Sequence, residues 1–152
     1  MTTKQLGNIG EAKTLAKFVE HNIPVYVAFG DNEKSDFIAD FNGKLNRIQC
    51  KTSEFMEDAT KIGFHLTTNT RGINGENKKH KYTKDEVDYF SLYNHESEIL
   101  LLVPLNVLEG KSTVTFRIPW QPSRNQNVSL NYEDFTFEKI MCVETLHETP
   151  KE

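Results

Sequence analysis

Residues 36–51 read DFIADFNGKLNRIQCK and contain two stretches, 36–41 and 44–51, in which apolar and polar side chains alternate. Alternation with a period of two is typical of a β-strand that has one buried face. Asn42-Gly43 lies between the stretches and suits a type I′ turn, because both turn positions need a positive φ. The segment therefore predicts a β-hairpin with a two-residue turn.

The two-residue turn also fixes which residues of the hairpin face each other. Phe41 pairs with Lys44, and counting outward places Asp36 opposite Gln49. Lys51 lies two residues beyond Gln49 and so shares its face. The pattern supports the same register independently, because the opposite face then carries a mostly apolar set: Phe37, Ala39, Phe41, Ile48 and Cys50.

An aspartate, an amide and an ammonium therefore converge on one face of the hairpin. Mg²⁺ prefers oxygen ligands, usually one or two carboxylates together with water and phosphate. Asp36 supplies a carboxylate, Gln49 offers a neutral carbonyl oxygen, and the Cys50 backbone carbonyl is a further candidate ligand. Lys51 can position or deprotonate an attacking water and offset phosphate charge.

Residues 3–21 have the periodicity of a helix, and Pro24 ends the helical region. Glu11 falls at the edge of the apolar arc, so its side chain is expected to face partly toward the sheet, where an unbound acid is costly. Gly7 and Gly10 would let the helix approach other backbone closely. Glu11 is therefore the candidate second carboxylate. The predicted apolar arc consists of Ile9, Ala12, Leu15, Ala16 and Val19.

The rest of the chain predicts strands, loops and a short C-terminal helix. Thr83 is expected to cap a helix that opens with Asp85, Glu86 and Asp88. Residues 99–104 form an apolar run and are expected to be a buried central strand. Further strands are predicted at 24–29, 62–67 and 112–118, polar loops at 69–81 and 119–127, and a helix at 132–140. This order predicts an α+β fold with one mixed sheet.

Length and composition predict one soluble domain over residues 1–152. A net charge of −4 gives no global sign of nucleic-acid binding. No stretch is apolar for long enough to cross a bilayer, and the first residues lack the features of a signal peptide, so we expect a cytoplasmic protein without membrane contact. Cys50 and Cys142 have no neighbouring His or Cys at ligand spacing and are expected to be reduced core thiols.

A local basic segment lies on this acidic chain. Between Asn69 and Lys84 the cations outnumber the acids, of which Glu76 is the only one. Because loops often carry binding function, DNA-contacting loops are expected near 68–82 and 119–128, with phosphates as the main partners. The candidate DNA-binding residues are Asn69, Arg71, Lys78, Lys79, His80 and Lys81.

Glu11, Asp36 and Gln49-Cys50-Lys51 together resemble the pattern of the PD-(D/E)xK nucleases: a helix acid, a strand acid, and acid-x-Lys on the next strand. Ser35 stands where the pattern has Pro, and Gln49 stands where Asp or Glu is usual. The chain also resembles the small homing endonucleases that group I introns encode. The stretches that carry this likeness are the basic segment, GNIGEA at 7–12, QCKTS at 49–53, KYTKDEVDYF at 81–90 and LLLVP at 100–104.

The resemblance implies a restriction-endonuclease-like core, a mixed β-sheet flanked by helices. It implies a site-specific endonuclease that hydrolyses double-stranded DNA with Mg²⁺, for which Mn²⁺ substitutes. The implied catalytic residues are Glu11, Asp36, Gln49 and Lys51, and Glu11, Asp36 and Cys50 are the implied metal ligands. A homo-tetramer is implied. Independently of the resemblance, cutting both strands needs at least a dimer, because one domain holds one site.

Three other functions fit parts of the pattern. A Holliday-junction resolvase shares the active-site pattern and would nick four-way junctions but not linear duplexes. The missing acid at Gln49 fits a catalytically inactive nuclease-fold protein, which would bind DNA without metal and never cut it. A structural RNA-binding protein would bind structured RNA in preference to duplex DNA.

Overall fold

The computed structural model describes residues 1–30, 33–118 and 129–145, with side chains described as far as Met141. The described part is α+β, as predicted, but its strands form a five-stranded, a three-stranded and a two-stranded sheet instead of one. None of its helices combines the length and hydrophobicity needed to span a bilayer. The helical elements are α1 (Thr3–Glu20), α2 (Leu105–Leu108), η1 (Tyr132–Phe135) and α3 (Phe137–Thr145). The strands are β1 (Val25–Val27), β2 (Phe37–Phe41), β3 (Lys44–Ser53), β4 (Lys61–His65), β5 (Thr67–Arg71), β6 (Asn77–Lys81), β7 (Tyr89–Asn94), β8 (Ile99–Pro104), β9 (Thr113–Arg117) and β10 (Leu130–Asn131).

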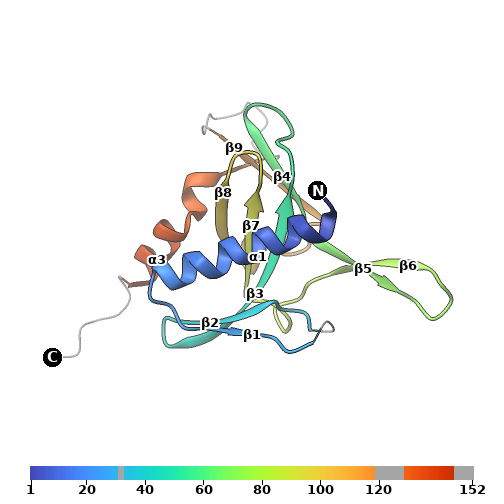
Figure 1. Cartoon of the computed structure of the whole chain (residues 1–152), viewed down its shortest axis with the longest axis horizontal. Coiled ribbons are helices and arrows are strands. Elements are labelled where there is room, and N and C mark those ends of the chain that lie inside the picture. The colour runs from blue at the N-terminus through green and yellow to red at the C-terminus, as the bar shows by residue number, and fades with distance from the viewer. Residues whose placement is uncertain (31–32, 119–128, 146–152) are drawn as a thin grey trace.

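The predicted hairpin, β2–β3, lies in the five-stranded sheet, whose strand order is β1-β2-β3-β7-β8. Phe41 pairs with Lys44 and Phe37 with Ile48, so the predicted register is confirmed. The turn residues Asn42 and Gly43 have φ values of 57° and 67°. The apolar face of the hairpin is buried, and a slip by one residue would turn that face to solvent. In Figure 1, α1 crosses one face of this sheet.

The segment 83–88 is a turn, so the helix predicted to begin at Thr83 is wrong. The Thr83 carbonyl accepts hydrogen bonds from the amides of Glu86 and Val87 at 3.0 and 3.1 Å. The chain then enters β7, which runs parallel to β3. All residues of 90–94 are buried, because β7 is covered on both faces, and this removes the alternation that would reveal a strand in the sequence.

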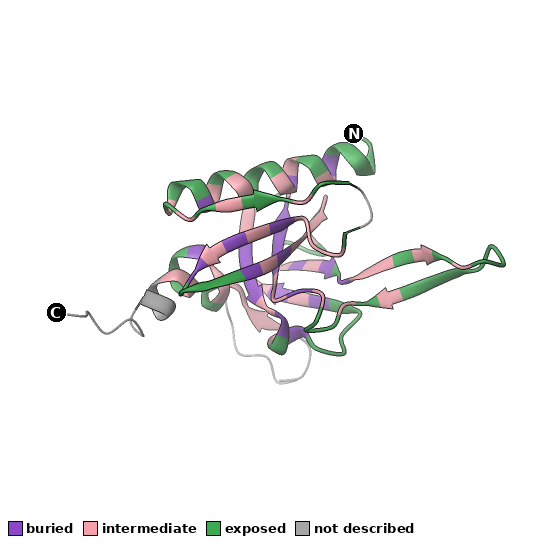
Figure 2. Ribbon diagram, turned by 90° about the horizontal axis from the view of Figure 1, so that it is seen from below, coloured by how far each residue is buried: buried purple, intermediate pink, exposed green. Residues whose placement is uncertain are grey.

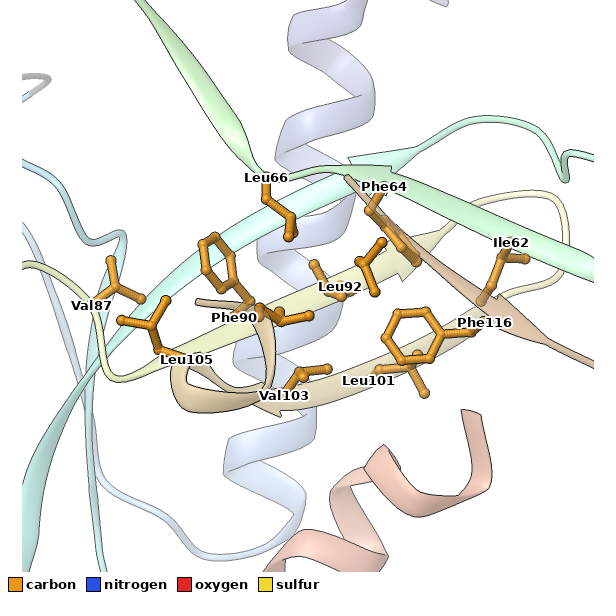
Figure 3. Packing of buried hydrophobic residues seen from close by; sticks show 12 residues of the cluster. Ile62, Phe64, Leu66, Val87, Phe90, Leu92, Leu101, Val103, Leu105 and Phe116 are labelled. Atoms are coloured by element: carbon orange, nitrogen blue, oxygen red, sulfur yellow. The ribbon is translucent and has the colours of Figure 1, made fainter. Parts of the chain in front are cut away.

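Hydrophobic cores on both faces of the five-stranded sheet explain why β8 is buried although it is the outermost strand. The predicted central position of β8 is therefore wrong, while its predicted burial is confirmed. Leu101 and Val103 belong to the core that includes residues of the three-stranded sheet, β10-β9-β4 (Figure 3). Leu102 belongs to the other core, where the rings of Phe18 and Phe137 meet edge to face with centroids 5.1 Å apart.

The buried stripe of α1 differs from the predicted apolar arc, because Ala12, Ala16 and Val19 are exposed. Small residues in the stripe let α1 lie close to β3. A Cβ added at Gly10 would collide with the Thr52 hydroxyl and lie 3.2 Å from the Thr52 Cβ. The stripe consists of Leu6, Gly10, Thr14 and Phe18.

A second hairpin, β5–β6, occupies the segment 69–81 that was predicted to be a loop. Its Cα partners run from Thr67–Lys81 to Arg71–Asn77. The sequence did not reveal these strands because both are polar, so no alternating apolar face marks them. The hairpin projects from the body as a ribbon (Figures 1 and 2).

The C-terminal part of the chain is described only in part. The helix predicted at 132–140 is present as η1 followed by α3. The predicted loop at 119–127 lies outside the described residues, as does the side chain of Cys142. The thiol of Cys50 is free.

The substitutions Gly10→Ala and Gly7→Ala should change the free energy of unfolding in opposite directions. Both positions lie inside α1, where alanine is preferred over glycine by roughly 1 kcal/mol. Gly7→Ala should raise the free energy of unfolding, because no atom lies within 4 Å of a Cβ added there. Gly10→Ala should lower it, because the methyl group displaces Thr52. Urea denaturation compares the variants, and equal stabilisation by both would contradict the close contact of α1 with β3.

Candidate active site

Asp36 lies just before β2 and is held against β3 by two hydrogen bonds. Its amide donates to the Ile48 carbonyl at 2.8 Å, and because Ile48 is also the partner of Phe37, two consecutive residues lie opposite one, as in a β-bulge. Its Oδ2 accepts a hydrogen bond from the Cys50 amide at 2.7 Å. Asp36 therefore sits beside Cys50 at the end of the hairpin, while the predicted pair of Asp36 with Gln49 lies beyond the last pair of the ladder.

Glu11 reaches the same place from α1, because Gly10 brings the helix against β3. Burial is the largest cause that raises the pKa of Glu11, and the negative charge of Asp36 adds to the shift. Burial also raises the pKa of Asp36, while the hydrogen bond from Cys50 and the charge of Lys51 oppose that shift. Two acids that are distant in sequence are thus brought within electrostatic range of each other, in surroundings that disfavour their charged forms.

Lys51 extends from β3 and contacts the base of the other hairpin. Its ammonium donates a hydrogen bond to the Thr67 carbonyl at 3.3 Å and lies 5.1 Å from the ring centroid of Tyr82. Burial lowers the pKa of Lys51, and the negative charge of Asp36 opposes this shift. A lowered pKa makes the neutral amine, which can accept a proton, more accessible. Neither Thr67 nor Tyr82 was predicted from the sequence as part of the site, because no local signal links them to Lys51.

Gln49 bonds to the backbone of the next residue. Its Nε2 donates a hydrogen bond to the Cys50 carbonyl at 3.2 Å. That carbonyl is one of the predicted metal ligands, and its oxygen has a second lone pair for another partner. A carboxylate at position 49 could not donate this bond, so Gln49 differs from an acid in its hydrogen bonding as well as its charge.

The comparisons with known proteins agree with this arrangement. A family model for the PD-(D/E)XK endonucleases matches residues 1–138, which include Glu11, Asp36, Gln49 and Lys51. The chain belongs to the PD-(D/E)XK endonuclease family. The solved structure of a bacterial homing endonuclease, I-Ssp6803I, matches with a TM-score of 0.72 and 16% sequence identity, over 98% of this chain and 100% of that one. At this identity the likeness concerns the fold, and it confirms the predicted restriction-endonuclease-like core. No curated protein matches the sequence.

PD-(D/E)XK endonucleases generally use divalent metal ions such as Mg²⁺. The carboxylates of Asp36 and Glu11 are suitable ligands for such an ion. Among the described residues, no three or more His, Cys, Asp and Glu side chains are placed to form a metal-binding group. Asp36 and Glu11 instead provide a pair of carboxylates, which suits Mg²⁺ because this ion usually takes its remaining ligands from water and phosphate. The raised pKa values of both acids show that the surroundings lack a positive charge sufficient to offset their burial.

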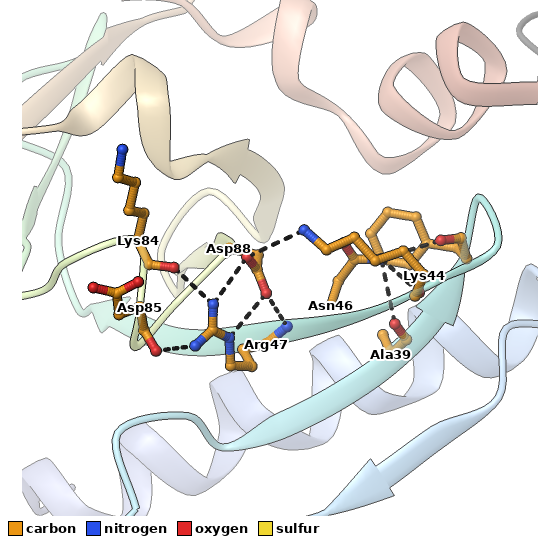
Figure 4. Close-up of polar contacts among 8 residues, drawn as sticks. Ala39, Lys44, Asn46, Arg47, Lys84, Asp85 and Asp88 are labelled. Carbon is orange, nitrogen blue, oxygen red and sulfur yellow. Dashed lines mark hydrogen bonds and ion pairs between the residues drawn. The ribbon is translucent and has the colours of Figure 1, made fainter.

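A polar cluster around Arg47 holds the turn 83–88 of this PD-(D/E)XK endonuclease against β3 (Figure 4). The amide and Nε of Arg47 donate to Oδ2 of Asp88 at 2.8 and 3.1 Å. Its guanidinium also donates to the backbone carbonyls of Lys84, at 2.6 Å, and Asp85. The cluster thereby fixes the chain that follows Tyr82, and no local pattern of residues predicts it.

The predicted DNA-binding residues all lie on the β5–β6 hairpin and divide between its two faces. The Nε2 of His80 lies 2.9 Å from a carboxylate oxygen of Glu86, so this ring already has a partner. The Nζ of Lys81 donates to the Gly110 carbonyl at 2.9 Å. By the alternation of the strands, Asn69, Arg71, Lys79 and Lys81 share one face, and Lys78 and His80 share the other.

Asp36→Asn should raise the melting temperature of the metal-free protein at neutral pH. The pKa of Asp36 is raised by folding, so its charge destabilises the fold above the folded-state pKa, and the penalty is relieved as pH falls through that pKa. Asparagine removes the charge and keeps an oxygen that can accept the bond from Cys50. Mg²⁺ should raise the melting temperature of the wild type but not of the variant, because only the wild type has the charged ligand.

The matched control is Asp40→Asn, because Asp40 lies on the same hairpin, opposite Leu45 and nearer the turn. This control should respond to Mg²⁺ as the wild type does. Two results would contradict the assignment of Asp36 as a metal ligand. One is a metal-free Asp36→Asn protein that melts below the wild type, and the other is a variant whose melting temperature Mg²⁺ raises as much as that of the wild type.

Proposed function

We propose that this endonuclease is a site-specific homing endonuclease that cuts double-stranded DNA with Mg²⁺, or with Mn²⁺ in its place. The observation that carries the proposal is the meeting of Asp36 and Lys51 beside Gln49 and Cys50 at one end of the β2–β3 hairpin, with Glu11 brought within electrostatic range of Asp36 by α1. A pair of partly buried acids beside a lysine suits hydrolysis of a phosphodiester. The sequence features that the chain shares with the small homing endonucleases support its assignment as a homing endonuclease.

Each residue of the site has a proposed part in the hydrolysis. Mg²⁺ supplies a positive charge that polarises the scissile phosphate and stabilises the leaving oxygen. Asp36, Glu11 and the Cys50 carbonyl would hold the ion, and Gln49 orients that carbonyl through its hydrogen bond. Lys51 would orient the attacking water and, in its neutral form, accept the proton that the water loses as its oxygen bonds to phosphorus.

The β5–β6 hairpin is the proposed DNA-binding element, within the predicted contact segment 68–82. The major groove of B-DNA admits a two-stranded β-ribbon, and this hairpin is a ribbon that projects from the body (Figure 2). Asn69 and Arg71 carry groups that can bond to base edges, and Lys79 on the same face can bind phosphate. Lys78 lies on the opposite face, where it could reach a flanking phosphate. The second predicted segment, 119–128, is proposed to contact DNA as well.

The enzyme is proposed to act as a homo-oligomer in the cytoplasm. Each chain provides one site, and two-fold related copies are the simplest way to cut both strands. A tetramer is favoured over a dimer, as the resemblance to intron-encoded endonucleases implies. The free thiol of Cys50 is compatible with a reducing compartment.

The second candidate function is DNA binding without cleavage. The observation that favours it is Gln49, which stands in place of an acid and bonds to the Cys50 carbonyl. One negative charge fewer weakens metal affinity, since affinity follows the charge of the ligands. A protein of this kind would bind duplex DNA equally well with and without Mg²⁺ and would leave it intact.

Lys51→Ala and Asp36→Ala should each abolish cleavage of a duplex that the wild type cuts, while DNA affinity stays largely intact. Each loss should exceed tenfold in rate, or about 1.4 kcal/mol in activation free energy. Asp40→Ala is the control, because Asp40 lies on the same face further along the hairpin, and it should keep wild-type activity. A folded Lys51→Ala protein that cuts at more than a tenth of the wild-type rate would exclude the proposed role. Nicking of four-way junctions but not of linear duplexes would indicate a resolvase instead.

Replacing Arg71 and Lys79 together with glutamine should weaken DNA binding and flatten its dependence on salt. Each phosphate contact that is lost should reduce the slope of log affinity against log salt by roughly 0.9. The control replaces two exposed cations outside the hairpin, Lys111 and Lys139, and should leave the slope unchanged. If both double variants have the wild-type slope, this face of the hairpin does not contact DNA.

A further inference from the structure

The ammonium of Lys51 is held by the base of a hairpin to which Lys51 does not belong. Lys51 extends from β3, but its hydrogen-bond acceptor is the carbonyl of Thr67, the first residue of β5, at 3.3 Å. Its ammonium also lies over the ring of Tyr82, the residue that follows β6, 5.1 Å from the centroid. Thr67 pairs with Lys81 at the open end of the β5–β6 ladder, the end opposite the turn. Both partners of the ammonium therefore lie where the projecting ribbon joins the body.

The ring of Tyr82 is fixed by two aromatic neighbours. It meets the ring of Phe90 edge to face, with centroids 5.5 Å apart, and Phe90 is buried on β7. It meets the ring of His80 in the same manner at 5.8 Å. The ring thus has a defined position against the core.

One carboxylate holds a residue on each side of Tyr82. Glu86 accepts a hydrogen bond from the Thr83 amide at 3.1 Å, and its carboxylate lies 2.9 Å from Nε2 of His80. His80 precedes Tyr82 by two residues and Thr83 follows it directly. The Arg47 cluster anchors the turn 83–88 to β3, so the strand that carries Lys51 and the turn that follows Tyr82 are joined independently of the Lys51 contact.

We propose that Tyr82 is a positioning residue for Lys51: the face of its ring, together with the Thr67 carbonyl, holds the ammonium beside Asp36. This inference rests on the proposed function. Lysine has a long flexible stem and a compact charge, so a fixed partner is needed to confine it to one place. An aromatic face attracts a cation through its quadrupole, which a leucine of similar bulk cannot do. Because the partners lie at the base of the proposed DNA-binding ribbon, the ribbon that binds DNA also helps to place the catalytic amine.

The contact can be measured without any cleavage assay. In protein labelled with ¹³C-lysine, the side-chain signals of Lys51, assigned by their loss in Lys51→Arg, should be shifted upfield by the Tyr82 ring current. The shift should persist in Tyr82→Phe, which keeps the ring, and vanish in Tyr82→Leu. Unshifted Lys51 signals in the wild type would overturn the proposal, and this result requires no variant of Tyr82 to fold.

Kinetics on a duplex that the wild type cuts then separates positioning from general packing. Tyr82→Leu should lower kcat by about tenfold and leave KM and DNA affinity within about twofold, because the lysine is misplaced while the DNA-binding face is unchanged. Tyr82→Phe should restore at least about half of the wild-type kcat, since it restores the cation–π partner. The matched control is Tyr132→Leu, because Tyr132 is also half-buried and packs against the same core as Tyr82, and it should keep the wild-type kcat.

The experiments test the positioning role of Tyr82 and the proposed cleavage of DNA separately. Equal losses of kcat in Tyr82→Leu and Tyr132→Leu, or a Tyr82→Phe variant as impaired as Tyr82→Leu, would overturn the positioning role of the ring. An upfield-shifted Lys51 in a wild-type protein that cuts no duplex would support the contact and contradict the proposed function.

Discussion

The register of the β2–β3 hairpin determines where the groups of the candidate site lie. Because side chains alternate along a strand, a slip of one residue would turn Gln49 and Lys51 into the core and bring Ile48 and Cys50 to solvent. Two features prevent that slip, the Asn42-Gly43 turn with positive φ at both positions and the burial of the apolar face. Glu11 depends on the same register, since Gly10 fits against Thr52 only when β3 presents that threonine to α1.

Burial shifts the pKa values of the ionisable groups in the site and also lowers the stability of the fold when those groups are charged. Glu11, Asp36 and Lys51 all have pKa values shifted by burial in the direction that disfavours their charged forms. The charges of Asp36 and Lys51 offset part of that penalty for each other, but Asp36 and Glu11 repel each other. A divalent cation beside the acids would offset this repulsion. The neutral side chain of Gln49 limits the negative charge that must be buried.

Local patterns predicted the part of the fold that carries most of the site. The β2–β3 hairpin, its register and its buried face are fixed by a turn and an alternation that lie within residues 36–51. α1 was predicted as a helix, but its buried stripe was misjudged, because close approach to β3 selects the small residues Gly10 and Thr14 over the larger Val19. Hydrophobicity alone does not reveal that choice.

The elements that were missed depend on tertiary contacts. β7 is covered on both faces, so its residues show no alternation, and the acids before it serve a turn held by Arg47 instead of opening a helix. β5 and β6 are polar, and they place Thr67 and Tyr82 against an amine from another part of the chain. The sequence therefore predicted Glu11, Asp36, Gln49 and Lys51 but not the residues that hold Lys51 in place.

Incubation of the protein with a randomised duplex library would show whether this site hydrolyses double-stranded DNA with Mg²⁺. Sequencing of the cut ends should show breaks in both strands at a recurrent sequence, only when Mg²⁺ or Mn²⁺ is present. Two-fold related cuts would further support action by paired copies. A library that is bound and enriched but remains uncut at every concentration of metal would contradict the account.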